Sequence, residues 1–279
     1  MTIDRRTFTT SLLLGAGAGI AGLPRAAEAI IAPSPRATLL IDQATGKVLH
    51  RSGQCAARFS PCSTFKIPLA LMGYDAGILK DAHTPAWDYD PRIHEAVRDI
   101  DKASTDPTRW EKDSVIWYSR EITKRLGAAK FKAYVDRLNY GNRDVTGDPG
   151  KANGLSNAWL GSSLMISPDE QVAFLRRMLA HKLLSAQACA RTEAILPVFE
   201  GSGGWRVHGK TGSGWLKNRA GGEDRTRQLG WFVGWADKAG PRGKRRVTFA
   251  HFQMTARPDQ PGGFTARTEL LAMIGRLAG

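Results

Sequence analysis

The first alternation of apolar and polar positions along the chain predicts a β-hairpin. Apolar runs at 37–41 and 47–49 have strand composition, and the segment 42–46 between them has turn composition. The next apolar run, Ser63 to Met72, is long enough for a buried helix that starts near Ser63. Pro68 falls inside this run, where we expect it to bend the helix.

The middle of the chain has helical periodicity. Residues 115–126 and 128–138 repeat apolar positions at helical spacing. Ser167 and Glu170 flank Pro168 in the pattern of a capping box, which predicts a helix that reaches about Lys182. The segment 143–157 is rich in Gly, Asn and Asp, so we expect a loop there.

Strand-like runs return toward the C-terminus. They cover residues 206–211, 229–235 and 247–254, and a helix is predicted from about Phe264 to Leu277. This order predicts an α/β (α+β) fold, in which an antiparallel sheet is flanked by terminal helices and an all-helical lobe is inserted at roughly 85–185. A functional site would lie in the cleft between the lobe and the sheet.

The first 29 residues have the composition of an export signal. Arg5 and Arg6 precede a Gly-, Ala- and Leu-rich stretch, and residues 27–29 form an A-x-A cleavage site. A twin-arginine signal and an ordinary secretory signal both fit. No later window holds 18 apolar residues, so no stable membrane insertion is predicted. The sequence therefore predicts a periplasmic or secreted domain at residues 30–279.

The charge balance is strongly basic. The formal net charge is +14, and cleavage after residue 29 would remove only one net positive charge. Such a surface attracts anions through its field alone. The densest basic run, Arg242 to Arg246, lies between two strand-like segments and is interpreted as a solvated turn. We therefore predict no specific nucleic-acid binding.

Three cysteines, Cys55, Cys62 and Cys189, bear on the compartment and on the site. An oxidising compartment permits a disulfide, and an odd count leaves one thiol over. Cys55 and Cys62 are close in sequence and are a candidate bridge beside Ser63; two small buried thiols are the alternative. The chain has no C-x-x-C pair and no H-E-x-x-H, so no metal site is predicted.

One segment matches the phosphate-binding loop motif, but its sequence context does not support nucleotide binding. Residues 204–211 satisfy G-x-x-x-x-G-K-[ST], the phosphate-binding loop. That loop must open a helix whose N-terminus receives the phosphate, but Gly212-Ser213-Gly214 follows here. Nucleotide binding is therefore not predicted. The chain also has no G-x-S-x-G elbow.

The pattern S-x-x-K occurs once, at Ser63-Thr64-Phe65-Lys66. At the start of a helix, residues i and i+3 share a face, which places the lysine amine beside the serine hydroxyl. A serine needs an adjacent base to act as a nucleophile, and a lysine serves only when it is uncharged. Burial and the helix N-terminus both disfavour the ammonium form. A capping serine with a surface lysine is the plainer interpretation of this motif alone.

Four further elements follow in order: a serine in the helical lobe, Y-G-N, a tryptophan, and K-T-G on a late strand. They are Ser114, Tyr140-Gly141-Asn142, Trp159 and Lys210-Thr211-Gly212. With S-x-x-K, this set resembles the class D β-lactamases, the oxacillinase type, across about residues 30 to 279. The resemblance implies the penicillin-binding and serine β-lactamase fold, hydrolysis of β-lactam antibiotics, and no cofactor besides CO2 or bicarbonate for lysine carboxylation.

The resemblance implies catalytic roles for five residues. Ser63 would attack the lactam carbonyl and form an acyl-enzyme. Lys66 would carry a carboxylated amine, N6-carboxylysine, as the base for acylation and deacylation, and Trp159 would hydrogen-bond that group. Ser114, assisted by Lys210, would pass a proton to the leaving lactam nitrogen.

The resemblance also implies contacts with the small-molecule β-lactam. Thr211, Lys210 and Arg267 would bind the substrate carboxylate, and the backbone N–H groups of Ser63 and Ser213 would form the oxyanion hole. The whole set expected around the substrate is Ile116, Tyr140, Asn142, Thr211, Gly212, Ser213 and Arg267.

One departure from the family pattern stands at Ile116, where S-x-V is usual after Ser114. The added methylene should tighten the pocket beside Lys66 at a cost of about 1 kcal/mol. A penicillin sensor and a D,D-peptidase-type penicillin-binding protein share the Ser-Lys pair and are the alternatives. The sequence leaves the oligomeric state and the range of β-lactam substrates open.

Overall fold

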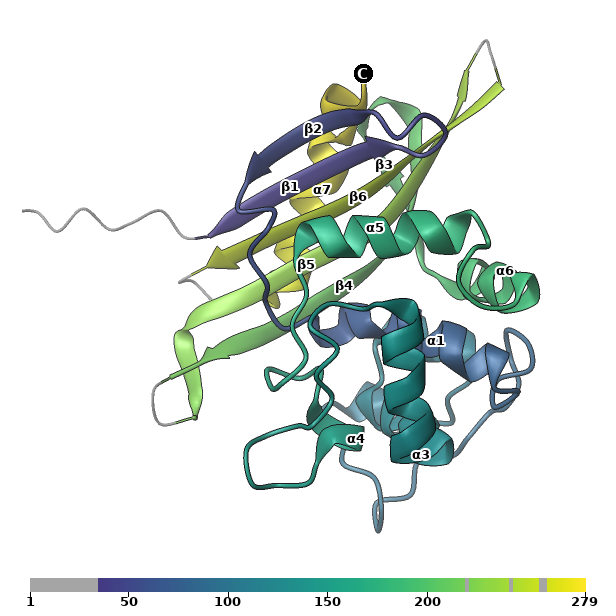
Figure 1. The fold of residues 1–279 in the computed structure, drawn as a ribbon, viewed down its shortest axis with the longest axis vertical. Coiled ribbons are helices and arrows are strands. Elements are labelled where there is room, and N and C mark those ends of the chain that lie inside the picture. Colours follow the sequence, from purple (N-terminus) through teal and green to yellow (C-terminus); the bar gives the residue numbers. More distant parts are fainter. Residues whose placement is uncertain (1–34, 219–220, 241–242, 256–259) are drawn as a thin grey trace, which may run out of the picture. The chain divides into compact units, whose positions relative to one another are not determined.

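The framework of the chain is an antiparallel sheet. The computed structural model describes residues 35–218, 221–240, 243–255 and 260–279, and in this part six strands pair in the order β2-β1-β6-β5-β4-β3 (Figure 1). Every neighbouring pair is antiparallel. The strands are β1 Arg36–Asp42, β2 Val48–Gly53, β3 Val198–Gly201, β4 Trp205–Lys217, β5 Glu223–Gly240 and β6 Gly243–Thr255. The export signal expected at residues 1–29 lies outside the described residues.

Helices fill the middle of the chain and its C-terminal end. They are α1 Lys66–Asp75, α2 Pro107–Asp113, α3 Ile116–Leu138, α4 Gly154–Asn157, α5 Pro168–Leu179, α6 Ala186–Ile195 and α7 Gly262–Ala278. Short 3-10 turns occur at η1 Cys62–Phe65, η2 Asp99–Lys102 and η3 Ser202–Gly204. The predicted α+β class, an antiparallel sheet with helices inserted between its strands, is confirmed.

Each face of the sheet has its own hydrophobic core. Successive side chains of a strand point to opposite faces. On β5, Trp231 and Val233 join the core that contains α1, α3 and α5, whereas Phe232 and Ala236 join the core that contains α7. Helix α7 contacts β4, β5 and β6, and α5 contacts β1, β5 and β6 (Figure 1). The sheet is thus buried on both sides, which explains the nearly continuous apolar composition of its central strands.

The helical lobe is predicted at roughly 85–185. Helix α5 lies inside that range and contacts β1, β5 and β6 of the sheet. The capping box and the amphipathic pattern of α5 predict the helix correctly. They do not predict which element the apolar face of the helix packs against.

Most local predictions are confirmed, with shifted boundaries. The first hairpin forms, with a register shift between Leu40 and Ile41. The capping box of Ser167 and Glu170 is present, and the helix that it opens ends at Leu179. The two helices predicted on either side of Gly127 form α3, with Gly127 itself non-helical at φ +72°.

Two local expectations are corrected. Pro68 does not fall in a helix interior, because α1 begins at Lys66 and places Pro68 in the first turn, where no backbone N–H is needed. The segment predicted as loop at 143–157 ends in the single turn of α4.

Strand β4 runs without a break from Trp205 to Lys217. It therefore passes straight through the residues that match the phosphate-binding loop, and no helix follows them. The exclusion of that loop is confirmed, since its geometry needs a helix N-terminus at this point.

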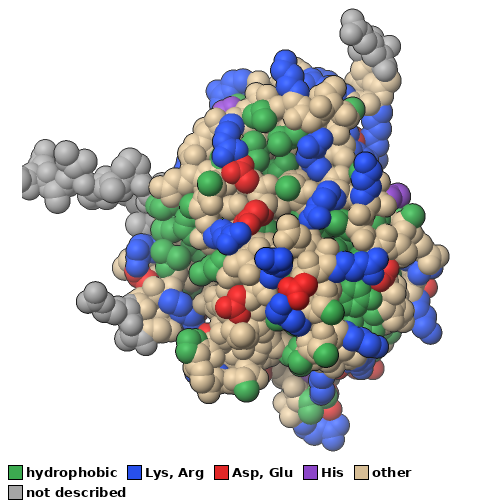
Figure 2. All heavy atoms as spheres, in the orientation of Figure 1, with side chains coloured by type: hydrophobic (Ala, Val, Ile, Leu, Met, Phe, Trp, Pro, Cys, Tyr) green, Lys and Arg blue, Asp and Glu red, His purple; other side chains and the backbone are tan. Residues whose placement is uncertain are grey.

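The described part of the basic run, residues 243–246, begins β6. Its described members pair with acidic side chains: Lys244 and Arg246 with Asp237, and Arg245 with Asp42. On the face in Figure 2, Lys and Arg side chains are scattered among neutral and acidic ones. Within the described residues, none of the helices has the length and hydropathy needed to cross a bilayer.

The candidate disulfide between Cys55 and Cys62 is not formed. All three cysteines are free and buried. The sulfur of Cys55 lies 3.3 Å from the Ser52 carbonyl oxygen, whereas that of Cys62 lies 3.8 Å from Ser60 Oγ. A disulfide needs its sulfurs at about 2 Å, and these two side chains point to different neighbours. Closeness in sequence did not bring the two thiols together.

We predict that the protein, unfolded without reductant, reacts with three equivalents of a thiol reagent. In the folded protein Cys62 should react slowly at neutral pH, because burial raises the pKa of its thiol to about 11 and leaves little thiolate. A sample reduced beforehand is the control. A count of one thiol without reductant and three with it would contradict the structure.

Candidate active site

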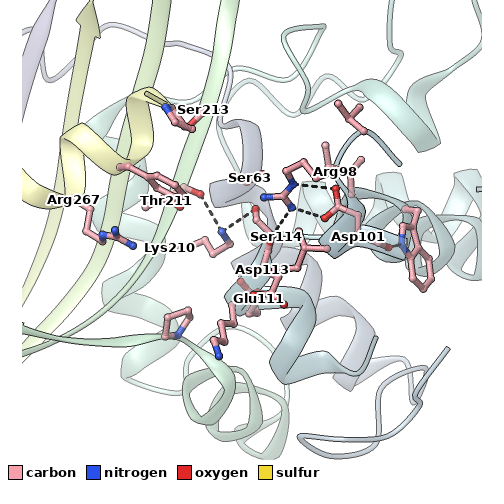
Figure 3. A pocket seen from close by; sticks show the side chains of 18 of the residues that line it. Ser63, Arg98, Asp101, Glu111, Asp113, Ser114, Lys210, Thr211, Ser213 and Arg267 are labelled. Atoms are coloured by element: carbon pink, nitrogen blue, oxygen red, sulfur yellow. Dashed lines mark hydrogen bonds and ion pairs between the residues drawn. The ribbon is translucent and has the colours of Figure 1, made fainter. Parts of the chain in front are cut away.

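A cleft of about 540 Å³ opens between the helical lobe and the sheet. Ser114, the C-cap of α2, lies at one wall, and β4 supplies Lys210, Thr211 and Ser213 at the other (Figure 3). Ile116 of α3 also lines the cleft. Ser63 and, from α7, Arg267 complete the part of the lining that the sequence predicted. The cleft therefore lies where the fold class placed a functional site.

Ser63 and Lys66 are held together by the junction of two helical segments. Ser63 lies in η1, and Lys66 begins α1. Lys66 Nζ donates a hydrogen bond to Ser63 Oγ at 3.4 Å. Cys62, directly before Ser63, has φ +48°, which is a left-handed backbone conformation. Any residue other than glycine adopts this conformation at a cost in free energy. The predicted serine–lysine contact is thus present, on a backbone held in an unusual conformation.

The Lys66 amine is almost completely removed from water. Its residue is 1% exposed, and every residue from Lys66 to Tyr74 is buried. This burial lowers the pKa of the Lys66 ammonium below its ordinary value; the nearby Lys210 charge lowers it further, while Glu111 opposes the change. Desolvation penalises the charged form of an amine, so the site favours an uncharged one.

Ser114 and Lys210 form a second pair across the cleft. Lys210 Nζ donates to Ser114 Oγ at 3.0 Å and to the Thr211 carbonyl oxygen at 3.2 Å. Ser114 ends α2 with φ +61°, a left-handed C-cap that separates α2 from α3. Burial lowers the pKa of Lys210, and Glu111 opposes that change. The helix end thus aims the Ser114 hydroxyl at a lysine on the opposite wall.

Arg267 carries positive charge at the same end of the cleft as Thr211 (Figure 3). Its guanidinium carbon lies 4.8 Å from the centre of the Phe199 ring and 5.0 Å from that of Phe264. Such cation–π contacts orient the guanidinium without using its hydrogen-bond donors. Those donors therefore stay available to an anion in the cleft.

Three residues expected around the substrate do not line the cleft. Tyr140 is fully buried and its hydroxyl donates to Gln171. Both ends of the Asn142 amide bond to backbone, with Nδ2 donating to the Ser163 carbonyl and Oδ1 accepting from Met165 N–H. Gly212 is buried against η1, and a Cβ there would lie 2.8 Å from the Pro61 carbonyl oxygen. In this structure the three positions lie behind the walls of the cleft, and their contact with a substrate stays a prediction.

Trp159 lies in the core behind the serine–lysine pair. It is 1% exposed, and its ring stacks on Phe65 with the centroids 5.3 Å apart. The backbone carbonyl of Trp159 accepts a hydrogen bond from Ser60. The structure thus places Trp159 next to the turn that carries Ser63 and Lys66, and its hydrogen bond to a modified Lys66 stays a prediction.

The cleft also contains charged residues that the sequence did not single out. Glu111 lines it and is fully buried. Arg98 forms an ion pair with Asp101 and donates to the backbone carbonyl of Asp113, one residue before Ser114. The only local signal for Glu111 is its place three residues before Ser114, and no sequence pattern marks it as buried. In the described part of the chain, no three His, Cys, Asp or Glu side chains gather as metal ligands do.

Comparison with known proteins agrees with this geometry. Residues 36–256 match the penicillin-binding protein transpeptidase domain family. The chain is 45% identical to the β-lactamase OXA-9 of Klebsiella pneumoniae over 246 residues, 88% of each protein. It is 38% identical to OXA-1 of Escherichia coli over 199 residues, 70% of this chain and 68% of that protein. The crystal structure of the OXA-427 class D β-lactamase superposes with a TM-score of 0.79 at 44% identity, covering 87% of this chain and 98% of that one. The chain is a member of the class D serine β-lactamases.

Proposed function

We propose that this protein hydrolyses β-lactam antibiotics through an acyl-enzyme on Ser63. The observation that carries the proposal is the contact of the buried Lys66 amine with Ser63 Oγ. Ser63 lines a cleft that Ser114, Lys210 and Arg267 also line. A buried amine of lowered pKa can accept a proton at neutral pH, which an exposed lysine cannot.

Acylation uses both walls of the cleft. Ser63 Oγ bonds to the lactam carbonyl carbon and loses its proton to the base at Lys66. The lactam C–N bond then breaks, and Ser114 donates a proton to the nitrogen while Lys210, 3.0 Å from Ser114 Oγ, replaces it. The backbone N–H groups of Ser63 and Ser213 stabilise the oxyanion, and water accepts the acyl group in the second step.

Substrate orientation comes from the sheet and α7. Thr211, Lys210 and Arg267 bind the substrate carboxylate, to which a guanidinium presents paired N–H donors. Ile116 faces the same cleft and narrows it. We assign Tyr140, Asn142 and Gly212 to the architecture of the walls and not to substrate contacts.

The residues around Lys66 fit a carboxylated lysine. CO2 reacts with an uncharged amine, and burial lowers the pKa of Lys66 in the direction that such an amine requires. The resulting carbamate supplies the base for both chemical steps. Lys210 offers compensating positive charge, and Trp159 packs at the turn that carries Lys66. No other cofactor enters the proposal.

We also propose that residues 1–29 export the protein to the periplasm or beyond. The pair of arginines, the apolar stretch and the A-x-A site support this assignment. Export would place the enzyme where it meets β-lactams before they reach cell-wall enzymes.

The first test is turnover of a chromogenic cephalosporin combined with intact mass spectrometry. We expect many turnovers per enzyme molecule, a transient adduct on the wild type, and neither turnover nor adduct for Ser63→Ala. Ser52→Ala, which changes an exposed serine, is the control and should behave as wild type. One stoichiometric burst with a persistent adduct would indicate a sensor and contradict the proposal. Cleavage of D-Ala-D-Ala peptides with no cephalosporin turnover would indicate a peptidase and contradict it as well.

The second test addresses Lys66. Lys66→Ala should fold but lose about a hundredfold or more of the turnover rate, because it lacks the base. Activity should fall as pH drops through the lowered pKa of Lys66, because the protonated amine cannot react with CO2. Bicarbonate should restore activity lost in CO2-free acidic buffer.

Carbon-13 bicarbonate gives the direct readout for this second test. A carbamate resonance should appear in the wild type and in Lys124→Ala, which removes a 71% exposed lysine side chain, and it should be absent from Lys66→Ala. If neither the turnover rate nor the spectrum of the wild type depends on CO2, the proposal that Lys66 is carboxylated is contradicted. Ser63 would still be the proposed nucleophile.

A further inference from the structure

Glu111 is a buried acid in the active site to which the proposed mechanism gives no role. It lies in α2, three residues before Ser114, and lines the cleft below Asp113 and Ser114 in Figure 3. It is 0% exposed, and within the part of the chain that the structure describes neither carboxylate oxygen has a hydrogen-bond partner. Burying a carboxylate without partners costs free energy, so a structure that keeps one must compensate its charge or neutralise it.

Among the described residues, the two catalytic lysines are the charges that act on the Glu111 carboxylate. Burial raises the pKa of Glu111, and first Lys210 from β4 and then Lys66 from α1 lower it. Burial raises the pKa of the Tyr74 hydroxyl, also from α1, and the charge of Glu111 raises it further. Among the described residues Glu111 makes no ion pair at contact distance, so it acts on both lysines through the field of a dry pocket.

We propose that Glu111 is a positioning residue that sets the charge of Lys66 and Lys210, and through them the pH range and the bicarbonate requirement of the enzyme. This inference rests on the proposed function, because it concerns the same two lysines. Glu111 does not touch the substrate; it acts through the groups that do.

The sign of its effect follows from its charge. As an anion, Glu111 favours the ammonium form of both lysines and raises the pKa of each. It therefore helps Lys210 to remain charged beside Ser114, but it opposes the uncharged Lys66 that the base requires. Arg98 and Arg267 act on Lys210 in the opposite direction, and Arg98 also opposes Glu111 at Lys66, whereas Asp101 supports it there.

The negative charge of Glu111 also disfavours a second negative charge on carboxylated Lys66. When the Lys66 nitrogen bonds to CO2, one N–H proton must leave, and a negative charge appears at a group whose field already acts on the Glu111 carboxylate. Two close anions in a water-poor pocket repel, which raises the pKa of the second. Glu111 is therefore expected to take up one proton as Lys66 is carboxylated, so that the pocket keeps a constant net charge.

The test is Glu111→Gln, which keeps the shape of the side chain and removes its charge. Without the anion, the pKa of each lysine falls, so both the acid and the alkaline limb of the turnover–pH profile should move to lower pH by about one unit or more. The bicarbonate concentration that gives half of the carbon-13 carbamate signal should fall about tenfold, as one pKa unit implies. Glu111→Asp, which retains a carboxylate, should keep both limbs near their wild-type positions.

The matched control is Glu95→Gln. Glu95 lines the same cleft, but its side chain is 85% exposed, so water screens its charge and neither limb should move. A uniform loss of activity in Glu111→Gln, with both limbs and the bicarbonate requirement unchanged, would reduce Glu111 to a packing role and overturn the inference.

A measurement on the wild type avoids any dependence on a variant that fails to fold. With carbon-13 in the glutamate side chains, one buried carboxyl should gain a proton when bicarbonate is added. No glutamate response to bicarbonate would overturn the inference. If the wild type itself shows neither turnover nor a carbamate signal, the proposed function fails. If the wild type turns over substrate but the pH profile of Glu111→Gln does not shift, only the inference about Glu111 fails.

Discussion

The free-energy cost of holding an ammonium ion away from water at Lys66 governs the rest of this site. The first nine residues of α1, from Lys66 to Tyr74, are all buried, so the amine has neither solvent nor an exposed surface to turn toward. In such a place an amine is either compensated by an anion or uncharged. The uncharged state makes the lysine useful as a base, and the compensated state makes it inert. Two nearby groups shift this balance in opposite directions. Lys210 favours the uncharged Lys66 amine, whereas Glu111 favours the charged one.

The backbone is arranged to bring those charges together from distant parts of the chain. Cys62 and Ser114, both with left-handed φ values, turn Ser63 and the end of α2 toward the cleft. Gly212 lets β4 approach η1 closely, where any Cβ would press on the Pro61 carbonyl. Because these contacts link helices to the sheet, the distance between the Ser63–Lys66 pair and the Ser114–Lys210 pair depends on how the two parts pack. This explains why residues with no contact to a ligand can belong to a catalytic motif.

Local chemistry made much of the fold and part of the site predictable. The capping box at Ser167, the break at Gly127 and the strand–helix order depend on neighbouring residues, and the structure agrees with them. The contact of Ser63 with Lys66 follows from the i, i+3 spacing alone. Roles that depended on long-range packing were less predictable. Tyr140 and Asn142 stand in the Y-G-N motif of the family pattern, yet their side chains bond to Gln171 and to the backbone of Ser163 and Met165.

The burial of Glu111 shows why the other features of the site could not be predicted from the sequence. Its neighbours in sequence, Lys112 and Asp113, are exposed and half-buried, and a charged run on a short helix normally faces water. Only the packing of α2 in the folded protein, where it contacts α3 and α6, turns this one carboxylate inward. The same limit applies to Cys55 and Cys62, whose sulfurs have different neighbours although the residues are seven positions apart.

The measurement that tests the account most directly is the titration of the Lys66 amine in the wild-type protein. Lysine labelled with carbon-13 at Cε, observed by NMR in CO2-free buffer and assigned with Lys66→Arg, reports the charge of this one side chain. The account predicts a titration midpoint well below the ordinary lysine value of about 10.4. A Lys66 signal that titrates at that ordinary value would show a charged amine at neutral pH, and the enzyme described here would then have no base.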